Sequence, residues 1–116
     1  MNELREKLVK GMLDIVMLRI IADQPTHGYK IIKTIQQRYD LYFGPSTIYP
    51  MLNVLEKEGY VKSQWEFPSS KHKFGKPTDK PCKTYTITLK GKTRLGCGQT
   101  ELETIVKPLI QVRANA

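Results

Sequence analysis

Cysteine and histidine are scarce in this chain, and their scarcity excludes several kinds of site. The 116 residues include two cysteines and two histidines, and neither pair has the close spacing of a local zinc-binding motif. Cys82 and Cys97 are too few for a disulfide framework, so free thiols in a reducing compartment are expected. The sequence therefore predicts no metal site and a cytoplasmic protein.

Long apolar runs are also missing. The longest, residues 12–22, contains Asp14 and Arg19 and is too short to cross a bilayer. The first ten residues are mostly polar and charged, which does not match a signal peptide. The sequence has no grouping of serine, histidine and acid, no glycine-rich phosphate loop and no pair of catalytic carboxylates. We therefore expect neither a membrane protein nor an enzyme, and no cofactor.

Positive charge is abundant and unevenly distributed. The net charge is +8 and the isoelectric point is about 9.6. Residues 67–94 hold eight lysines and arginines against a single acid, Asp79, which accounts for +7 of that excess. Such a field predicts an anionic partner, whether nucleic acid, a membrane surface or an acidic protein. Its confinement to one segment favours a docking surface over the alternative, a lysine-rich loop that only keeps the protein in solution.

Local signals predict three helices in the first half of the chain. Residues 3–22 have a helical apolar pattern, which ends at the turn signal Asp23-Gln24-Pro25. A second helix is expected to begin at Thr26, whose hydroxyl is a good N-cap. A third covers residues 45–58, with a proline suited to the first helical position and a glycine just beyond the end.

Two strands and a last helix are expected in the second half. Residues 60–67 and 84–89 alternate in polarity around a segment rich in proline, lysine and serine, which predicts a β-hairpin. The last helix should open at Thr88 or Lys90. A break or bend is expected in it near Gly96–Gly98, and a kink at Pro108.

The order of these elements predicts the fold class. Three helices followed by a hairpin form a winged helix-turn-helix, an α+β fold that is mostly α, with a three-helix core and a two-stranded β wing. Residues 1–95 would form this DNA-binding domain, and residues 96–116 would form a C-terminal dimerisation helix. An apolar a/d seam supports the second assignment. It consists of Leu102, Ile105, Leu109 and Val112.

The third predicted helix would present a polar face suited to DNA. On a helical wheel the apolar positions fall on one side, at Ile48, Met51, Leu52 and Leu55. The outward side carries Ser46, Pro50, Asn53 and Lys57, flanked by Thr47 and Tyr49. Such hydrogen-bonding side chains can reach base edges from the N-terminal end of a recognition helix. The alternative is that Ser46 is only an N-cap, Tyr49 packs on the second helix and Asn53 is a plain surface residue.

Three stretches of the sequence resemble the PadR family of bacterial and archaeal transcriptional regulators. They are "THGYKI" at residues 26–31, "GPSTIYPMLNVLEKEGYV" at 44–61 and "KTYTITLKGKTRL" at 83–95. The middle stretch is the most specific, because it is similar to the family's recognition-helix signature. The resemblance implies a homodimeric winged-helix DNA binder, usually a repressor, that dimerises through its N- and C-terminal helices.

The resemblance also implies roles for particular residues. Twelve side chains would meet double-stranded DNA: Ser46, Thr47, Tyr49, Asn53, Lys57, His27, Lys30, Lys71, Lys73, Lys76, Lys83 and Tyr85. Leu4 and Leu8 of the first helix would join the C-terminal seam in the dimer interface. Family members often sense small aromatic effectors near that interface. The only tryptophan, Trp65, lies on a predicted strand and not on the dimer helix, so the sequence does not locate an effector pocket.

The leading hypothesis is a sequence-specific regulator that binds double-stranded DNA as a homodimer. One alternative is a winged-helix protein that binds nucleic acid through its wing with little sequence choice. Another is an adaptor whose basic hairpin meets an acidic protein.

Overall fold

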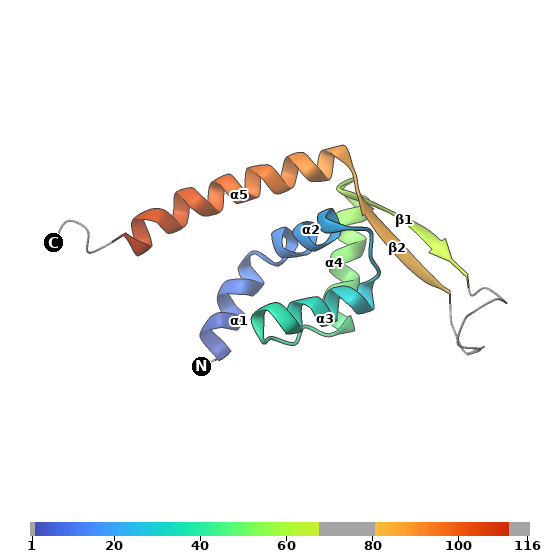
Figure 1. Cartoon of the computed structure of the whole chain (residues 1–116), viewed down its shortest axis with the longest axis horizontal. Coiled ribbons are helices and arrows are strands. Elements are labelled where there is room, and N and C mark those ends of the chain that lie inside the picture. The colour runs from blue at the N-terminus through green and yellow to red at the C-terminus, as the bar shows by residue number, and fades with distance from the viewer. Residues whose placement is uncertain (1, 68–80, 112–116) are drawn as a thin grey trace.

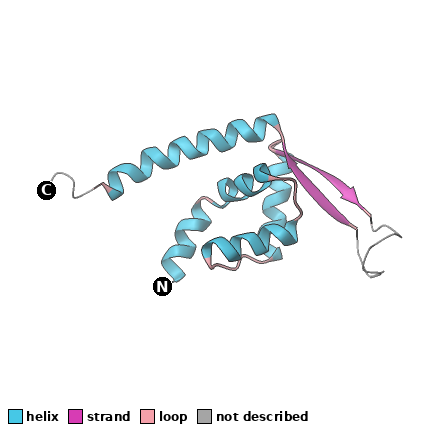
Figure 2. Cartoon of the chain, viewed as in Figure 1, coloured by secondary structure: helices cyan, strands magenta, loops and turns pink. Residues whose placement is uncertain are grey.

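The computed structural model describes residues 2–67 and 81–111. In this part the chain forms five helices and one antiparallel hairpin (Figures 1 and 2). In chain order these are α1 (Asn2–Gly11), α2 (Leu13–Asp23), α3 (Gly28–Tyr39), α4 (Pro45–Lys57), β1 (Val61–Glu66), β2 (Cys82–Ile87) and α5 (Leu89–Ile110). Helices α2, α3 and α4 form the body, the hairpin projects from one side of it, and α5 extends away on the other (Figure 1).

The first helix expected from the sequence is in fact two helices, α1 and α2. The chain leaves helical geometry at Met12, with φ −126° and ψ 28°, directly after Gly11, a residue type that weakens helices. Met12 N donates a hydrogen bond to Val9 O (3.0 Å), which closes the turn. On either side of this joint Val9 and Leu13 are both buried. The prediction of a single helix over residues 3–22 was therefore wrong at this joint.

The hydrophobic core lies between α2, α3, α4 and the base of the hairpin. Helix α2 is apolar on several sides, and six of its eleven residues are buried. On α4, Ile48, Leu52 and Leu55 are buried and Met51 is half-buried, which confirms the core side assigned from the helical wheel. The opposite face of α4 is consequently turned away from the body.

The start of α3 differs from the prediction. The N-cap is His27, whose Nδ1 accepts a hydrogen bond from Lys30 N (3.4 Å), and not Thr26. Thr26 is buried and pairs with β2. Its N–H donates to Tyr85 O (3.1 Å), and Tyr85 N donates to Thr26 O (2.7 Å). This bridge ties the wing to the turn before α3, a long-range contact that no local sequence pattern indicates.

Strands β1 and β2 form the two-stranded wing that the alternating pattern predicts. They run antiparallel, with Ser63 opposite Tyr85. Thr88 holds the base of the wing, because its hydroxyl donates to Gly59 O (2.6 Å) and accepts from Gly91 N (3.0 Å). Thr88 thereby caps α5, as expected, and Gly59 ends α4 with a φ of 85° that favours glycine.

Helix α5 runs without interruption from Leu89 to Ile110, so the chain does not break near Gly96–Gly98. Gly98 allows α5 to approach α2, because a Cβ there would lie 2.3 Å from Ile15 Cδ1. A Cβ on Gly96 would meet nothing within 4 Å. Each glycine costs a helix interior only about 1 kcal/mol, and at Gly98 the contact with α2 favours the helix.

Apolar side chains lie on the outer surfaces of α1 and α5. The domain boundary expected after residue 95 falls inside α5, so one continuous helix joins the body to the C-terminal segment. Four residues assigned to the dimer interface are 56% to 70% exposed in the single protomer: Leu4, Leu8, Ile105 and Leu109. Leu102 is half-buried, and Val112 lies outside the described residues. In the described ranges, no helix combines the length and the apolar character needed to cross a membrane.

Candidate nucleic-acid interface

The outward face of α4 is open along its length. Ser46, Pro50, Asn53 and Lys57 are exposed, Tyr49 is 41% exposed and Thr47 is half-buried. The N-cap is Gly44, in extended backbone, and no side chain caps the first N–H groups. The alternative that Ser46 serves only as the N-cap is therefore wrong. The first turn of α4 presents a hydroxyl together with the positive end of the helix dipole.

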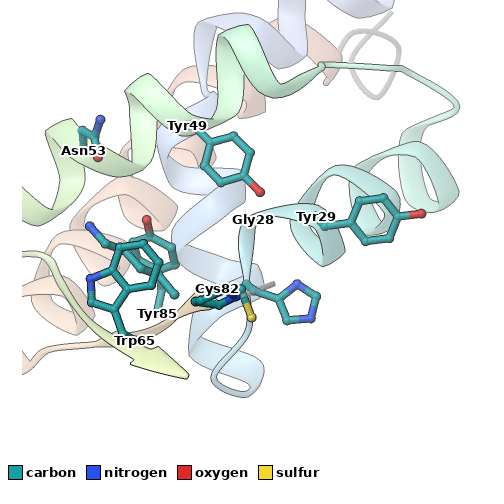
Figure 3. A pocket seen from close by; sticks show the side chains of 10 residues that line it. Gly28, Tyr29, Tyr49, Asn53, Trp65, Cys82 and Tyr85 are labelled. Carbon is teal, nitrogen blue, oxygen red and sulfur yellow. The ribbon is translucent and has the colours of Figure 1, made fainter. Parts of the chain in front are cut away.

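Tyr49 packs across the start of α3 (Figure 3). A Cβ on Gly28 would lie 2.5 Å from Tyr49 Cε1 and 2.7 Å from the Tyr49 hydroxyl oxygen, so only glycine leaves room for the ring. Helices α3 and α4 thus meet through this contact between Gly28 and Tyr49. Tyr49 packs on α3 and still keeps an exposed edge.

His27 stands at the N-terminus of α3 with one ring nitrogen engaged. Because Nδ1 accepts from Lys30 N, the proton of the neutral ring lies on Nε2, which is left as a donor. Lys30 is exposed on the same turn. Both residues therefore stand at the positive end of a helix, where anions bind favourably. Their contact with phosphate stays a prediction.

A cavity of about 360 Å³ lies between α3, α4 and the wing (Figure 3). Five of the predicted DNA-binding residues line it: His27, Tyr49, Asn53, Lys83 and Tyr85. Other predicted positions stand outside its walls: Lys30, Ser46, Thr47 and Lys57. Three of the predicted wing lysines fall outside the described residues: Lys71, Lys73 and Lys76. The cavity therefore joins the recognition helix to the base of the wing.

Tyr85 is 2% exposed, which contradicts its predicted position on the DNA backbone. Its main chain pairs with Thr26, and its phenol lies inside the protein near α4. Burial raises the pKa of that phenol above the ordinary value of 10.0, and the Glu56 carboxylate and Tyr49 raise it further. Tyr85 therefore joins the wing to the body.

The raised pKa of Tyr85 makes stability depend on alkaline pH. The unfolded chain releases the phenol proton near pH 10.0, whereas the folded protein retains it to a higher pH. The stabilising contribution is complete below the unfolded pKa and is lost as the pH rises through the folded pKa. We expect denaturant midpoints to fall more for the wild type than for Tyr85→Phe between about pH 8 and about pH 10.5. An identical fall in both proteins would contradict the assignment.

Two contacts that shape the interface were not predicted. Ser63 Oγ donates to Glu56 Oε2 (2.6 Å), which links β1 to α4. Trp65, two residues further along β1, lines the cavity, and Lys83 Nζ lies 5.3 Å from its ring centroid. The strand alternation did contain a signal for this arrangement, because it puts Ser63 and Trp65 on the same face as the buried Val61.

The helical body, the exposed face of α4 and the two-stranded wing define a winged helix-turn-helix protein. The profile of the PadR family, described as "Transcriptional regulator PadR-like family", matches residues 17–96. This match spans most of the chain, and the chain belongs to the PadR-like family of transcriptional regulators. Among curated proteins, none matches the chain in sequence.

Solved structures of transcriptional regulators, two of them described as PadR-family proteins, have the same fold. A regulator from Eggerthella lenta is 23% identical, with a TM-score of 0.77 over 97% of this chain and 93% of its own. A regulator from Clostridium thermocellum is 24% identical, with a TM-score of 0.74 over 92% of this chain and 98% of its own. A PadR-family regulator from Clostridium difficile is 26% identical, with a TM-score of 0.70 over 84% of this chain and 94% of its own.

Proposed function

We propose that this PadR-family chain is a sequence-specific regulator, acting as a repressor, that binds double-stranded DNA as a homodimer. Helix α4 would lie in the major groove and the wing on the adjacent phosphate backbone or in the minor groove. The observation that supports this most is the exposed polar face of α4 beside a cavity whose other wall is the wing. Two such surfaces at one cavity can meet a single duplex.

Asn53 is the side chain best suited to read a base. It is exposed on the outward face of α4 and carries an amide, which can form two hydrogen bonds with adenine N6 and N7. Ser46 and Thr47 lie in the first turn, the part of a recognition helix that reaches base edges. Hydroxyl groups bond to several bases, so these two residues would contribute less discrimination than Asn53.

Phosphate contacts would come from the wing and from the start of α3. Lys83 lies on β2, and His27 and Lys30 stand at the α3 N-terminus. The basic segment 67–94 supplies +7 of the protein's net charge of +8. Each phosphate that a lysine or arginine neutralises releases counterions, so affinity should fall steeply with salt.

A homodimer would remove exposed apolar surface from water. Leu4 and Leu8 on α1, and Ile105 and Leu109 on α5, are large apolar side chains exposed in the single protomer. Burying them against a second copy is favourable at roughly 25 cal/mol per Å². A two-fold dimer would carry two copies of α4 and read two half-sites about one DNA turn apart.

Competition binding tests the proposed sequence specificity. Duplexes selected from a random pool should share an inverted repeat and be preferred over bulk DNA at least about a thousandfold. Equal binding to all duplexes would identify instead a winged-helix protein of low specificity. An absence of binding at low ionic strength would contradict a DNA-binding role and favour the adaptor alternative.

Two sets of substitutions separate base reading from phosphate contact. Asn53→Ala should lose about 1–3 kcal/mol of discrimination at one base position. Replacing Lys73 and Lys76 together by alanine should weaken all sequences alike and flatten the log–log salt slope by about two. Gln99→Ala, which removes an exposed amide on α5, should change neither property. Base preference that survives Asn53→Ala would show that this residue does not read the site.

A further inference from the structure

One face of β1 continues the protein core outward along the wing. At the base of this face Val61 is 2% exposed, and the next residue on it, Ser63, donates to Glu56 of α4. The third, Trp65, lies beyond the body and lines the cavity together with Asn53 of α4 (Figure 3). This face of the wing is therefore turned toward the recognition helix.

The outer end of that face is aromatic and exposed. Trp65 and Phe67 are 54% and 70% exposed, and their rings are stacked with centroids 6.5 Å apart and planes inclined by 27°. Lys83 Nζ lies 5.3 Å from the Trp65 centroid. We call Trp65 and Phe67 the aromatic pair. On the opposite face of β1 the exposed side chains are polar: Lys62, Gln64 and Glu66.

The exposed aromatic surface on this side of the wing is unfavourable in water, and a partner that covered it would remove this free-energy cost. Apolar area left in water forgoes roughly 25 cal/mol per Å². A stacked pair with an ammonium group beside it offers both an apolar surface and a positive charge. Partners with those two complementary features are anionic chains whose charged groups alternate with apolar ones.

The sugar–phosphate strand between the two grooves of DNA is such a chain, with charged groups that alternate with apolar ones. A helix in the major groove and a wing in the adjacent minor groove are separated by one sugar–phosphate strand. That strand must cross the space between α4 and β1, where the cavity lies. Its phosphates carry the negative charge, and its deoxyribose rings present apolar C–H groups.

We propose that the aromatic pair packs on the deoxyribose rings of this strand while Lys83 contacts its phosphate. The inference rests on the proposed DNA-binding function and adds a contact that is not electrostatic. The pair supplies affinity for duplex DNA without reading sequence, because every nucleotide carries the same sugar. Tyr49, on the α4 wall of the cavity, contacts the same strand from the other side, and Asn53 is left to read a base.

The intrinsic fluorescence of the wild-type protein tests this contact directly. Trp65 is the only tryptophan in the chain, so all tryptophan emission reports on the aromatic pair. Saturating duplex DNA, with binding followed independently by anisotropy of a labelled duplex, should reduce acrylamide quenching roughly twofold as the ring becomes covered. Quenching that stays unchanged when the protein is fully bound would overturn the proposal.

Substitutions on the two faces of β1 provide the matched comparison. Trp65→Ala should weaken DNA binding about tenfold at every salt concentration, with the salt slope unchanged, because packing on a sugar releases no counterions. Trp65→Phe keeps an aromatic ring and should remain within about threefold of the wild type. Gln64→Ala, on the polar face of the same strand, should bind like the wild type.

The outcomes separate this proposal from the proposed function. If the wild type binds its selected duplex and Trp65→Ala binds equally well, the aromatic pair serves another macromolecule and this proposal alone fails. Equal weakening by Gln64→Ala would also overturn it, because the effect would not belong to the aromatic face. A wild type that binds no duplex would overturn both. Should Trp65→Ala not fold, the quenching result on the wild type decides.

Discussion

Alanine in place of Gly91 should lower the free energy of unfolding by about 3 kcal/mol, the upper end of typical overpacking costs. A Cβ at this position would lie 2.0 Å from Tyr60 O and 2.7 Å from Ile87 Cγ1. The first of these atoms belongs to the backbone and is already held, because Thr88 N donates to it at 3.0 Å. Relief of the clash would therefore require the wing to separate from α5.

Gly96→Ala is the control for this substitution. Both glycines lie in α5, but a Cβ on Gly96 would meet nothing within 4 Å, so alanine should stabilise the helix by about 0.5–1 kcal/mol. Denaturant unfolding at one fixed protein concentration measures both, since the stability of the proposed dimer would depend on concentration. If Gly91→Ala is as stable as Gly96→Ala, the junction is less tightly packed than the structure indicates.

The double variant Ile105→Asp with Leu109→Asp should convert the proposed dimer to a monomer. It should also lower affinity for the selected duplex at least about a hundredfold. These side chains are 56% and 70% exposed in the protomer. Charged groups in a desolvated apolar interface are costly unless they are paired. A monomer would also bind through one half-site only, which loses the contribution of the second α4. Sedimentation velocity measures the first effect, and anisotropy with the selected duplex measures the second.

The control adds the same charge to another side of α5. Thr100 and Thr104 are exposed and lie well around the helix from the apolar seam, so Thr100→Asp with Thr104→Asp should leave a dimer. If both double variants remain dimeric, the interface does not include the α5 seam. If the seam variant is monomeric yet binds the duplex with unchanged affinity, the protein does not read DNA as a dimer.

The elements predicted correctly are those with strong local signals. The core side of α4 follows from apolar spacing, and its end follows from Gly59, whose φ of 85° favours glycine. The wing follows from alternation, and the start of α5 follows from a threonine that caps it. In each case the residues that determine the structure are neighbours in the chain, so their effect can be read without knowledge of the fold.

Two of the wrong predictions concern contacts between distant residues, whereas the joint between α1 and α2 follows a local residue, Gly11. Thr26 is a good capping residue, yet its backbone is engaged by Tyr85, and His27 takes the capping position. Gly98 suggests a break in α5 but instead allows Ile15 to approach. Apart from proline, helix propensity is a weak preference of about 1 kcal/mol per residue or less, so packing against another element overrides it.

The candidate site also has one part that the sequence predicts and one part that only the structure shows. The polar face of α4 is present in the sequence because the helical period alone separates it from the core side. The surface of the wing that faces α4 cannot be read from the sequence. The position of Trp65 in the same cavity as Asn53 depends on how β1 packs against α4 through Ser63 and Glu56.

The sequence by itself determined the order of the elements from α3 onward, the face of α4 that is turned outward, and the family. Local periodicity and short motifs are sufficient for these, because helix and strand formation depend on residues a few positions apart. Only the tertiary structure decided that Tyr85 is buried, that α5 is one helix and that Trp65 lines a cavity shared with α4. These features depend on side chains far apart in the chain meeting in space, which no local pattern specifies.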